Sequence, residues 1–371
     1  MRRIGILTFH RAVNYGAILQ SYALVFACKS HCNVLCNIID YRSSFIENYY
    51  KTSQLFLPKN WKRLISYILF NGNIFPNRSR LVSFLYKNKC LITDSPVFGN
   101  ELEFEAIKYD RIITGSDQVW SPLAAGFDEN YFLTFISDPS KRASYAASIG
   151  LSEFPPNLIP IYKNRLHGFN NYSVRETSAK ILIEQLLGIN NVSVDLDPTL
   201  LLSKQEWKNC IDTQNVRETI RGLCGYILIY CISEKNEIFE IANIFKEQYH
   251  KDIIYINDRW HLKKHVKNIR NCNIDEWLYL FMHASMIVTD SFHGTAFALN
   301  FERQFVTYQS SLNKRATRIQ SLLHLVKLEQ RIVHNISSIS NLKYIDFASP
   351  IKSLELLRKK SISNLNKIVY E

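Results

Sequence analysis

No apolar run in this sequence of 371 residues is long enough to cross a membrane. The N-terminus also lacks the long apolar region of a signal peptide, and residues 4–9 instead read as a short buried strand. Zinc-finger spacing, a heptad-linked basic region and an aromatic RNA-binding signature are absent as well. We therefore expect a soluble cytoplasmic protein that has no nucleic-acid partner.

Dinucleotide cofactors are disfavoured, because no Gly-x-Gly-x-x-Gly follows the first expected strand. The eight cysteines are scattered, and the only close set is Cys28, Cys32 and Cys36. Their spacing of four is that of one helix face, whereas a metal site needs a fourth ligand and tighter pairs. We expect these thiols to be small buried side chains in a reduced compartment, with no metal bound.

Positive charge is plentiful, because Lys and Arg outnumber Asp and Glu by 45 to 33 and give a formal net charge of +12. This balance favours anionic partners, and anionic small molecules or an anionic membrane surface fit it best. Hydrophobic residues make up 47% of the chain, which is enough for two packed cores. The length also suggests about two domains.

Strand and helix patterns alternate along the chain, which predicts an α/β protein with parallel sheets. We expect strands at residues 4–9, 38–41, 111–114, 143–148, 172–174, 226–231, 253–256, 287–289 and 305–308, and helices at 17–28, 237–249 and 275–283. This order predicts one Rossmann-like domain at residues 1–211 and a second at 212–349. An amphipathic C-terminal helix at 350–371 is expected to complete the first domain.

Residues 45–95 interrupt this alternation with a segment rich in basic and aromatic side chains, such as Trp61, Arg63 and Phe70. One interpretation is a helical insertion whose aromatic residues join the core while its basic residues face solvent. The other is an interfacial patch for anionic lipid, in which aromatic and cationic side chains act together.

Four loops follow expected strands, and ligands of open α/β sheets bind at the carboxyl ends of strands. The first loop contains Asn14, Tyr15 and Gly16. Capping of the next helix by Asn14 explains this loop as well as binding does, in which Gly16 would let a ligand approach the backbone.

The second loop is a small turn that displays Ser116, Asp117, Gln118 and Trp120. A carboxylate, an amide and an indole suit the hydroxyls and the apolar face of a sugar ring. Ser and Asp are ordinary turn residues, but Gln118 and Trp120 add nothing to a turn. We therefore favour ligand contact here.

The third loop places Arg175 at a strand end, where a planar guanidinium could hold a carboxylate or phosphate through two hydrogen bonds. An ion pair with Glu176 or with a distant acid explains it equally well. The fourth loop, at residues 290–294, presents Ser291, His293 and the first N–H groups of a helix to one point. An anion would be stabilised there beside an imidazole, a group that can move a proton near neutral pH.

With these loops in order, the chain resembles the polysaccharide pyruvyl transferase family. The matching pieces are residues 5–9 with 14–20, Gly115-Ser116-Asp117-Gln118-Val119-Trp120, Ser173-Val174-Arg175-Glu176, Asp197-Pro198-Thr199 and Asp290-Ser291-Phe292-His293-Gly294. They span residues 4 to about 325 in the order that the family shows, whereas residues 45–95 match no family motif.

The resemblance implies a fold like that of two-domain GT-B glycosyltransferases, with two Rossmann-like domains facing across a cleft. It also implies an enzyme that moves the pyruvyl group of phosphoenolpyruvate onto two hydroxyls of a sugar, forming a cyclic ketal and releasing phosphate. The saccharide acceptor would be a lipid-linked precursor of capsule, exopolysaccharide or O-antigen, met at the inner face of the plasma membrane. Phosphoenolpyruvate is a co-substrate in this chemistry, which needs no metal or redox cofactor.

The resemblance assigns roles to the matching residues. Arg175 would hold the charge of the donor, and His293 would contact the donor phosphate and act as general acid. Ser291, Phe292 and Gly294 would shape the donor pocket, while Arg315 and Arg318 would either add positive charge near the donor or mark a solvated helix start. We assign Asp117 as a base for the acceptor hydroxyl, and we assign the acceptor contacts to Asn14, Tyr15, Gly16, Ser116, Gln118 and Trp120.

Two other functions fit the same residues. The first keeps the fold but makes the protein a GT-B glycosyltransferase that uses a nucleotide sugar. The second is a non-catalytic saccharide-binding protein in which Trp120 stacks on a sugar and His293 is inert.

Overall fold

The computed structural model describes residues 1–49, 78–87, 91–259, 261–310, 317–339 and 342–371. Their internal contacts divide them into two compact units. Of the described residues, unit 1 contains Met1 to Tyr49, Val82–Leu201 and Leu356–Glu371, and unit 2 contains 78–81 and Leu202–Glu355.

The division falls between Leu201 and Leu202, earlier than the polar stretch after residue 211 where we placed it. The reason lies in α8 (Lys204–Cys210), whose Trp207 packs against Phe297 of unit 2 with ring centroids 5.1 Å apart. This packing attaches the segment before residue 212 to the second unit.

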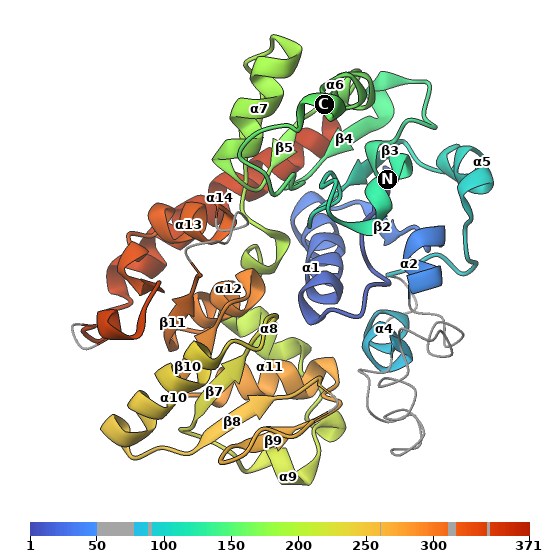
Figure 1. Cartoon of the computed structure of the whole chain (residues 1–371). Helices are drawn as coiled ribbons and strands as arrows, with labels where there is room; N and C mark the ends of the chain where they lie inside the picture. The colour runs from blue at the N-terminus through green and yellow to red at the C-terminus, as the bar shows by residue number, and fades with distance from the viewer. Residues whose placement is uncertain (50–77, 88–90, 260, 311–316, 340–341) are drawn as a thin grey trace, which may run out of the picture. The chain divides into compact units, whose positions relative to one another are not determined.

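Unit 1 is built on a parallel sheet with the strand order β2-β1-β3-β4; Figure 1 labels β2, β3 and β4. Its strands are β1 (Arg3–Leu7), β2 (Leu35–Ile38), β3 (Arg111–Thr114) and β4 (Arg142–Ser144), and a small second sheet pairs β5 (Ser173–Val174) with β6 (Ser193–Val194). Its helices are α1 (Tyr15–Cys32), α2 (Ser44–Tyr49), α5 (Leu102–Ala106), α6 (Ile159–Leu166) and α7 (Thr177–Leu187), and α4 (Arg78–Tyr86) lies largely in this unit.

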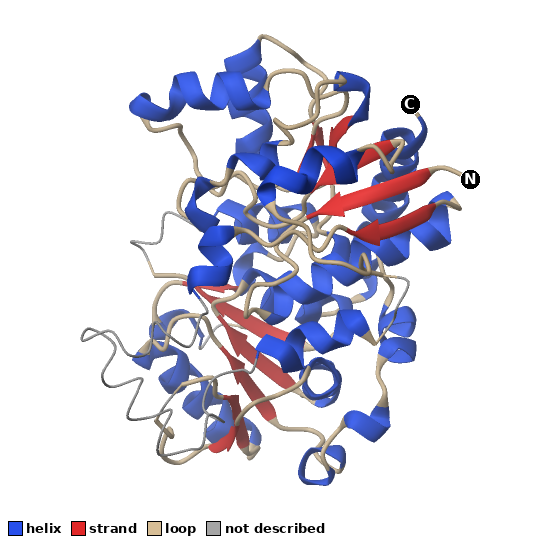
Figure 2. Ribbon diagram, turned by 90° about the vertical axis from the view of Figure 1, so that its right-hand side faces the viewer, coloured by secondary structure: helices blue, strands red, loops and turns tan. Residues whose placement is uncertain are grey.

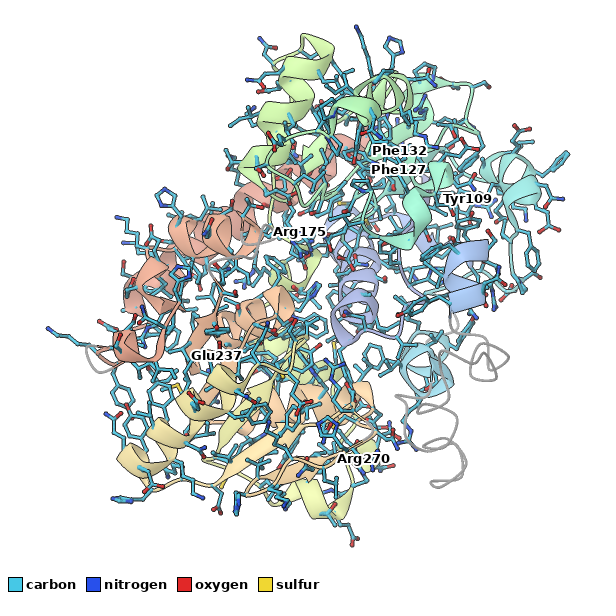
Figure 3. The ribbon with its side chains drawn as sticks, viewed as in Figure 1. Tyr109, Phe127, Phe132, Arg175, Glu237 and Arg270 are labelled. Atoms are coloured by element: carbon cyan, nitrogen blue, oxygen red, sulfur yellow. The ribbon has the colours of Figure 1, made fainter. Side chains whose placement is uncertain are left out.

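The helix α1 is apolar on nearly every side and is correspondingly buried along most of its length. It begins where the side chain of Asn14 accepts a hydrogen bond from the Ala17 N–H, and it ends at Asn33 in the left-handed conformation. Figure 2 shows helices flanking the strands of each unit. In unit 1 the core also contains Phe132, and the partly buried Phe127 packs against it; both are labelled in Figure 3, and their ring centroids lie 5.4 Å apart, edge to face.

The C-terminal helix α14 (Ala348–Tyr370) returns to the N-terminal part of unit 1. Arg2 donates from Nη1 to the carbonyl of Val369 at 2.8 Å, and the Tyr370 hydroxyl donates to the carbonyl of Cys32 at 2.6 Å. The two ends of the chain are therefore joined by hydrogen bonds within one unit.

Unit 2 contains a parallel sheet with the strand order β12-β11-β10-β7-β8-β9. Its strands are β7 (Ile227–Tyr230), β8 (Ile253–Ile256), β9 (Lys267–Ile269), β10 (Met286–Thr289), β11 (Gln304–Tyr308) and β12 (Ile332–Val333). Its helices, besides α8, are α9 (Glu218–Arg221), α10 (Asn236–Tyr249), α11 (Ile274–His283), α12 (Phe292–Asn300) and α13 (Thr317–Leu325).

The central strands of unit 2 are buried on both faces, as is usual for parallel sheets. Ile227 and Ile229 share one core cluster with the apolar face of α10, including Ile238 and Phe245. Because successive side chains of a strand alternate in direction, the equally buried Leu228 faces the opposite side of the sheet.

Several sequence predictions differ from the structure in detail. The second strand covers Leu35–Ile38 and not 38–41, and Cys36 therefore lies on a strand and not on one helix face with Cys28 and Cys32. All three thiols are buried. Most of the segment at 45–95, with Trp61 and its neighbours, lies outside the described residues. No helix in the described part of the chain is long and apolar enough to span a membrane.

A buried polar network joins the loop after β1 to the end of β2. His10 lies with Nε2 2.9 Å from Oδ1 of Asp40, and Oδ2 of the same carboxylate accepts hydrogen bonds from Arg42 and from the Tyr86 hydroxyl. Burial alone would raise the pKa of Asp40, but hydrogen bonds and charge from His10, with hydrogen bonds from Tyr86 and Arg42, outweigh it. They hold this pKa well below its usual value.

We expect Asp40→Asn to lower the free energy of unfolding at pH 7 by about 2 kcal/mol. Because the pKa of Asp40 is depressed in the folded protein, its stabilising effect is complete above the unfolded-state pKa of about 4 and is lost as the pH falls further. Urea unfolding between about pH 7 and pH 3 should therefore show a weaker pH dependence in Asp40→Asn than in the wild type. The exposed Asp94→Asn is the matched control, and an equal pH dependence in all three proteins would contradict this prediction.

Candidate functional site

The carboxyl ends of β1, β3 and β4 lie at one edge of the unit 1 sheet because these strands are parallel. At that edge β3 leads into Gly115, whose φ is +115°. A Cβ on this residue would lie 2.3 Å from the carbonyl oxygen of Tyr145, so glycine is required for the close approach of the two strand ends. The approach places the hydroxyl of Ser116 within 2.9 Å of the carbonyl oxygen of Ala146.

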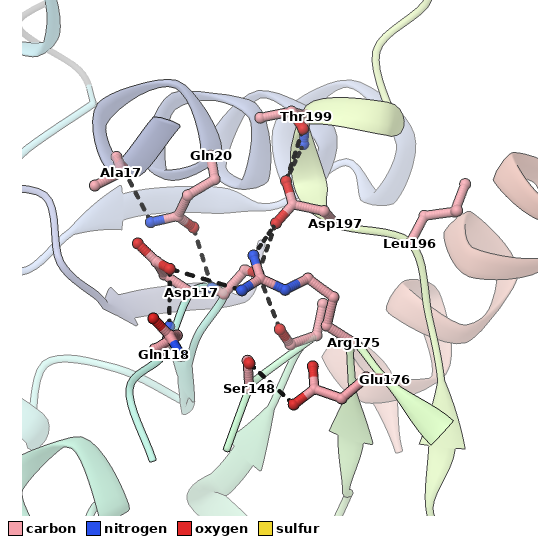
Figure 4. A network of polar contacts seen from close by, with 12 residues as sticks. Ala17, Gln20, Asp117, Gln118, Ser148, Arg175, Glu176, Leu196, Asp197 and Thr199 are labelled. Carbon is pink, nitrogen blue, oxygen red and sulfur yellow. Dashed lines mark hydrogen bonds and ion pairs between the residues drawn. The ribbon is translucent and has the colours of Figure 1, made fainter. Parts of the chain in front are cut away.

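Arg175 follows β5 and is the charged centre of this edge (Figure 4). Its side chain is 2% exposed, and Nη1 donates to Oδ2 of Asp197 at 2.6 Å while Nη2 lies 3.7 Å from Oδ1 of Asp117. Burial opposes the positive charge, but the nearby carboxylates of Asp197 and Asp117 outweigh it and raise the pKa of Arg175. An ion pair with a distant acid is therefore present, and a role for Arg175 in holding a donor stays a prediction.

Asp197 organises this edge, although we assigned it no role from the sequence. Besides Arg175, Oδ2 accepts from the Ser116 hydroxyl at 3.1 Å, while Oδ1 accepts from the backbone and hydroxyl of Thr199. The backbone N–H of Ser116 in turn donates to Oε1 of Gln20. Both Gln20 and Asp197 lie in the family-like pieces of the sequence, which was the available signal for them.

Glu176 forms a second carboxylate anchor beside this network (Figure 4). It is fully buried, and Oε1 accepts three hydrogen bonds, from the Ser148 hydroxyl and from the backbone N–H groups of Ile149 and Gly150, at 2.9 to 3.0 Å. These bonds tie the segment before α7 to the loop after β4. Glu176 also adds negative charge near Arg175, so three acids raise the pKa of that guanidinium.

Four residues that we assigned to acceptor contact are buried, and one of them is Gly16 in the first turn of α1. Trp120 is 0% exposed, and its indole N–H donates to the carbonyl of Tyr131 while its ring stacks on Phe132. This burial contradicts the expectation that the indole faces a sugar, because core packing takes the whole side chain. Ser116 is also fully buried and orients Asp197, and Tyr15 is 2% exposed.

The other acceptor residues lie nearer the surface of unit 1. Asn14 is half-buried and caps α1, which agrees with the capping interpretation of its loop. Asp117 and Gln118 are partly exposed, and the carboxylate of Asp117 accepts from the Gln118 N–H at 2.9 Å. Of the expected acceptor residues, Asn14, Asp117 and Gln118 therefore have surface to offer a ligand.

In unit 2 the expected strand, turn and helix are present as β10, residues 290–291 and α12. Ser291 is the N-cap, and its hydroxyl accepts from the Gly294 N–H at 3.3 Å, so the cap itself satisfies one donor of the expected anion site. A Cβ on Gly294 would lie 2.3 Å from Oγ1 of Thr289. Glycine is needed here because the first turn of α12 packs directly on the end of β10.

His293 lies in the first turn of α12 and is 6% exposed. Its ring meets the ring of Phe292 edge to face, with centroids 5.3 Å apart. The guanidinium of Arg318, at the start of α13, is 5.8 Å from the Phe292 ring centroid, which places a cation near this turn. Arg315 lies outside the described residues.

Asp290 connects this turn to the loop that follows β7. Its two carboxylate oxygens accept from the backbone N–H groups of Ile232 at 2.6 Å and Ser233 at 2.8 Å. Burial raises the pKa of Asp290, although these backbone hydrogen bonds work against the shift. The carboxyl ends of β7 and β10 are thus held together by one side chain.

The model of the family described as polysaccharide pyruvyl transferase matches residues 14–311, most of the chain. The chain belongs to the polysaccharide pyruvyl transferase family. The matched region contains the candidate residues of both units, from Gln20 and Asp117 at the sheet edge of unit 1 to His293 in the turn of unit 2. The resemblance inferred from the sequence is therefore confirmed.

Solved structures with a similar fold include two related to UDP-GlcNAc 2-epimerases. The enzyme from Methanocaldococcus jannaschii has a TM-score of 0.55 at 14% identity, covering 96% of this chain and 99% of its own. A putative enzyme from Listeria monocytogenes has a TM-score of 0.52 at 11% identity, covering 99% of this chain and 90% of its own. No curated protein matches the chain.

These structural neighbours have the GT-B fold, and this pyruvyl transferase family member shares it, as we expected from the sequence. Identities this low show the fold alone. The substrates named for the neighbours therefore say nothing about the donor of this chain.

We expect Asp197→Ala to lower the free energy of unfolding by about 3 kcal/mol, because it leaves the buried charge of Arg175 without its closest partner. Arg175→Met should lower the free energy of unfolding by a similar amount, because it removes the cation that pairs with the buried carboxylate of Asp197. The double variant should cost about 2 kcal/mol less than the sum of the single variants, since each single change has already broken the pair. Urea unfolding of the four proteins measures this coupling, and additive costs would show that the ion pair contributes nothing.

Proposed function

We propose that this family member transfers the pyruvyl group of phosphoenolpyruvate to two hydroxyls of a sugar in a cell-surface polysaccharide precursor. The product is a cyclic ketal, and inorganic phosphate leaves. Family membership supports a transferase that acts on a saccharide. The side chains at the sheet edge of unit 1 and in the turn at residues 290–294 of unit 2 support phosphoenolpyruvate as the donor.

The proposed reaction conserves its atoms without an oxidant or reductant. A proton adds to C3 of phosphoenolpyruvate, which becomes a methyl group, while C2 becomes electrophilic. One sugar hydroxyl attacks C2 and loses its proton, phosphate leaves, and a second hydroxyl attacks C2 and loses its proton to close the ring. The reaction thus calls for one general acid, one or two bases and a receptor for the donor's negative charges.

The general acid and the binding site for the donor phosphate are assigned to the turn before α12. His293 lies in the first helical turn, where the helix dipole favours a bound anion, and it carries the proton-transfer group of this turn. Arg318 adds a cation beside Phe292. We assign His293 to protonation of C3 and to contact with the donor phosphate.

The base is assigned to the edge of the unit 1 sheet, at the carboxyl ends of its strands. Asp117 is a partly exposed carboxylate at the end of β3, and it is held by the Gln118 N–H and by the charge of Arg175. We assign Asp117 to the acceptor hydroxyl and Arg175 to the charge of the donor. Asp197 and Glu176 act as positioning residues, because both contact the protein's own groups from fully buried positions.

The direct test supplies the purified protein with phosphoenolpyruvate and candidate lipid-linked sugars. We expect release of phosphate together with a product heavier by one pyruvyl group. His293→Gln should lower turnover by about 10² to 10⁴-fold, the usual range for loss of a general acid. The exposed His167→Gln is the matched control and should keep wild-type turnover.

Thermal unfolding accompanies this assay, because only a ligand that binds the native protein stabilises it. Phosphoenolpyruvate should raise the melting temperature, and nucleotide sugars should not. Stabilisation by a nucleotide sugar alone would contradict the proposed donor and favour a glycosyltransferase. Glycan binding that survives His293→Gln, without turnover of either donor, would make this chain a saccharide-binding protein.

A further inference from the structure

A cavity of about 630 Å³ lies in unit 2, away from the turn that contains His293. Its walls come from three segments: residues 223–226 directly before β7, residues 246 and 250–254 from α10 into β8, and residues 265–267 at the start of β9. Since β7, β8 and β10 are parallel, their amino ends lie at one edge of the sheet and the turn at residues 290–294 at the other. The cavity is therefore separate from the candidate donor site.

The lining of this cavity is strongly basic. It contains Lys246, Lys251 and Lys267 together with His250 and His265 and a single acid, Asp252. The lysines and the aspartate alone give a formal charge of +2. The volume falls within the range of about 300 to 1,000 Å³ that is usual for small-molecule sites.

Within the described part of the chain, the polar contacts of these ammonium groups involve no carboxylate. Lys267 donates to the carbonyl of Thr219 at 3.5 Å. Nζ of Lys251 lies beside Gly225, 3.6 Å from the point that a Cβ would occupy if this residue had a side chain. None of the three lysines forms a salt bridge with an acid among the residues that the structure describes. Three like charges around one hollow repel one another, and solvent reduces this repulsion for the exposed Lys251 and Lys267.

Helix electrostatics explain only part of this cluster. Lys246 and His250 lie at the carboxyl end of α10, where cations interact favourably with the helix dipole. Lys251, His265 and Lys267 lie outside that helix, on the loop before β8 and at the start of β9. Their convergence with Lys246 on one cavity needs a different reason.

We propose that this cavity is a binding site for a phosphate-bearing anion with room for at least a diphosphate. Phosphate oxygens accept short, charge-assisted hydrogen bonds from lysine, and several ammonium groups from different segments would surround the anion. Such an anion would neutralise the excess charge of the lining. The phosphate can belong to a soluble compound or to a phospholipid headgroup, and the chemistry of recognition is the same for both.

Cys224 provides a built-in reporter, because it is an exposed free thiol in the wall of the cavity. The test measures the rate at which iodoacetamide modifies Cys224 in the full-length protein, followed by peptide mass spectrometry so that other cysteines do not interfere. At a diphosphate concentration ten times the Kd, we expect modification to slow about tenfold, as mass action requires for an occupied site. Sodium chloride at matched ionic strength should give little protection.

Two triple variants locate the effect. Lys246→Gln with Lys251→Gln and Lys267→Gln should abolish protection by diphosphate. The matched triple of exposed lysines on α14, Lys352→Gln with Lys359→Gln and Lys360→Gln, changes the net charge equally and should keep protection. Each protein is compared with and without ligand, so that a change in the basal reactivity of Cys224 cancels.

Vesicles distinguish the two sources of phosphate. Protection by diphosphate but not by vesicles assigns the site to soluble phosphate compounds, whereas protection by phosphatidylglycerol vesicles but not phosphatidylcholine vesicles assigns it to an anionic lipid headgroup. Absence of protection by both, or equal protection in both triple variants, would overturn the proposal. Neither result depends on the pyruvyl transfer reaction.

Discussion

The buried ion pair between Arg175 and Asp197 is the constraint on which the ordered edge of unit 1 depends. Two charges with almost no exposure are costly to bury, and they persist because each satisfies the other and Asp197 also binds Ser116 and Thr199. The pair joins chain segments that follow β3, β5 and β6. Asp117, the partly exposed carboxylate that we assign as base, is therefore placed by charge and hydrogen bonds more than by apolar packing.

In unit 2 the turn that contains His293 is also held in place, but by different interactions. Its turn is fixed by a helix cap at Ser291, by the close approach of Gly294 to Thr289, and by Asp290, which holds the backbone after β7. His293, in the first turn of α12, is the side chain that we assign to proton transfer here. A fixed backbone with one titratable ring suits proton transfer to a bound anion, because little reorganisation is needed when charge develops.

Local patterns predicted much of the fold, since apolar strands and the capped helix α1 depend on neighbouring residues. Strand limits were less accurate: the ladder of β2 with β1 ends at Ile38, and beyond it Tyr41 forms an isolated bridge with Val97, because apolarity reports burial and not the extent of a ladder. The edge strand β9 was missed because it begins with the polar Lys267 and Asn268. Trp120 was misjudged because the direction of a side chain after a strand depends on tertiary packing. The partner of Arg175 lies 22 residues away, and no local pattern identifies it.

The central claim is that a proton is delivered to C3 of the donor before a ketal forms. The most direct measurement runs the reaction of phosphoenolpyruvate with its sugar acceptor in D2O and examines the ketal methyl group by NMR and mass spectrometry. A general acid that exchanges with solvent, as we assign to His293, predicts one deuterium in that methyl group for each ketal formed. A product without deuterium, or a sugar product that contains no pyruvyl ketal, would contradict the account.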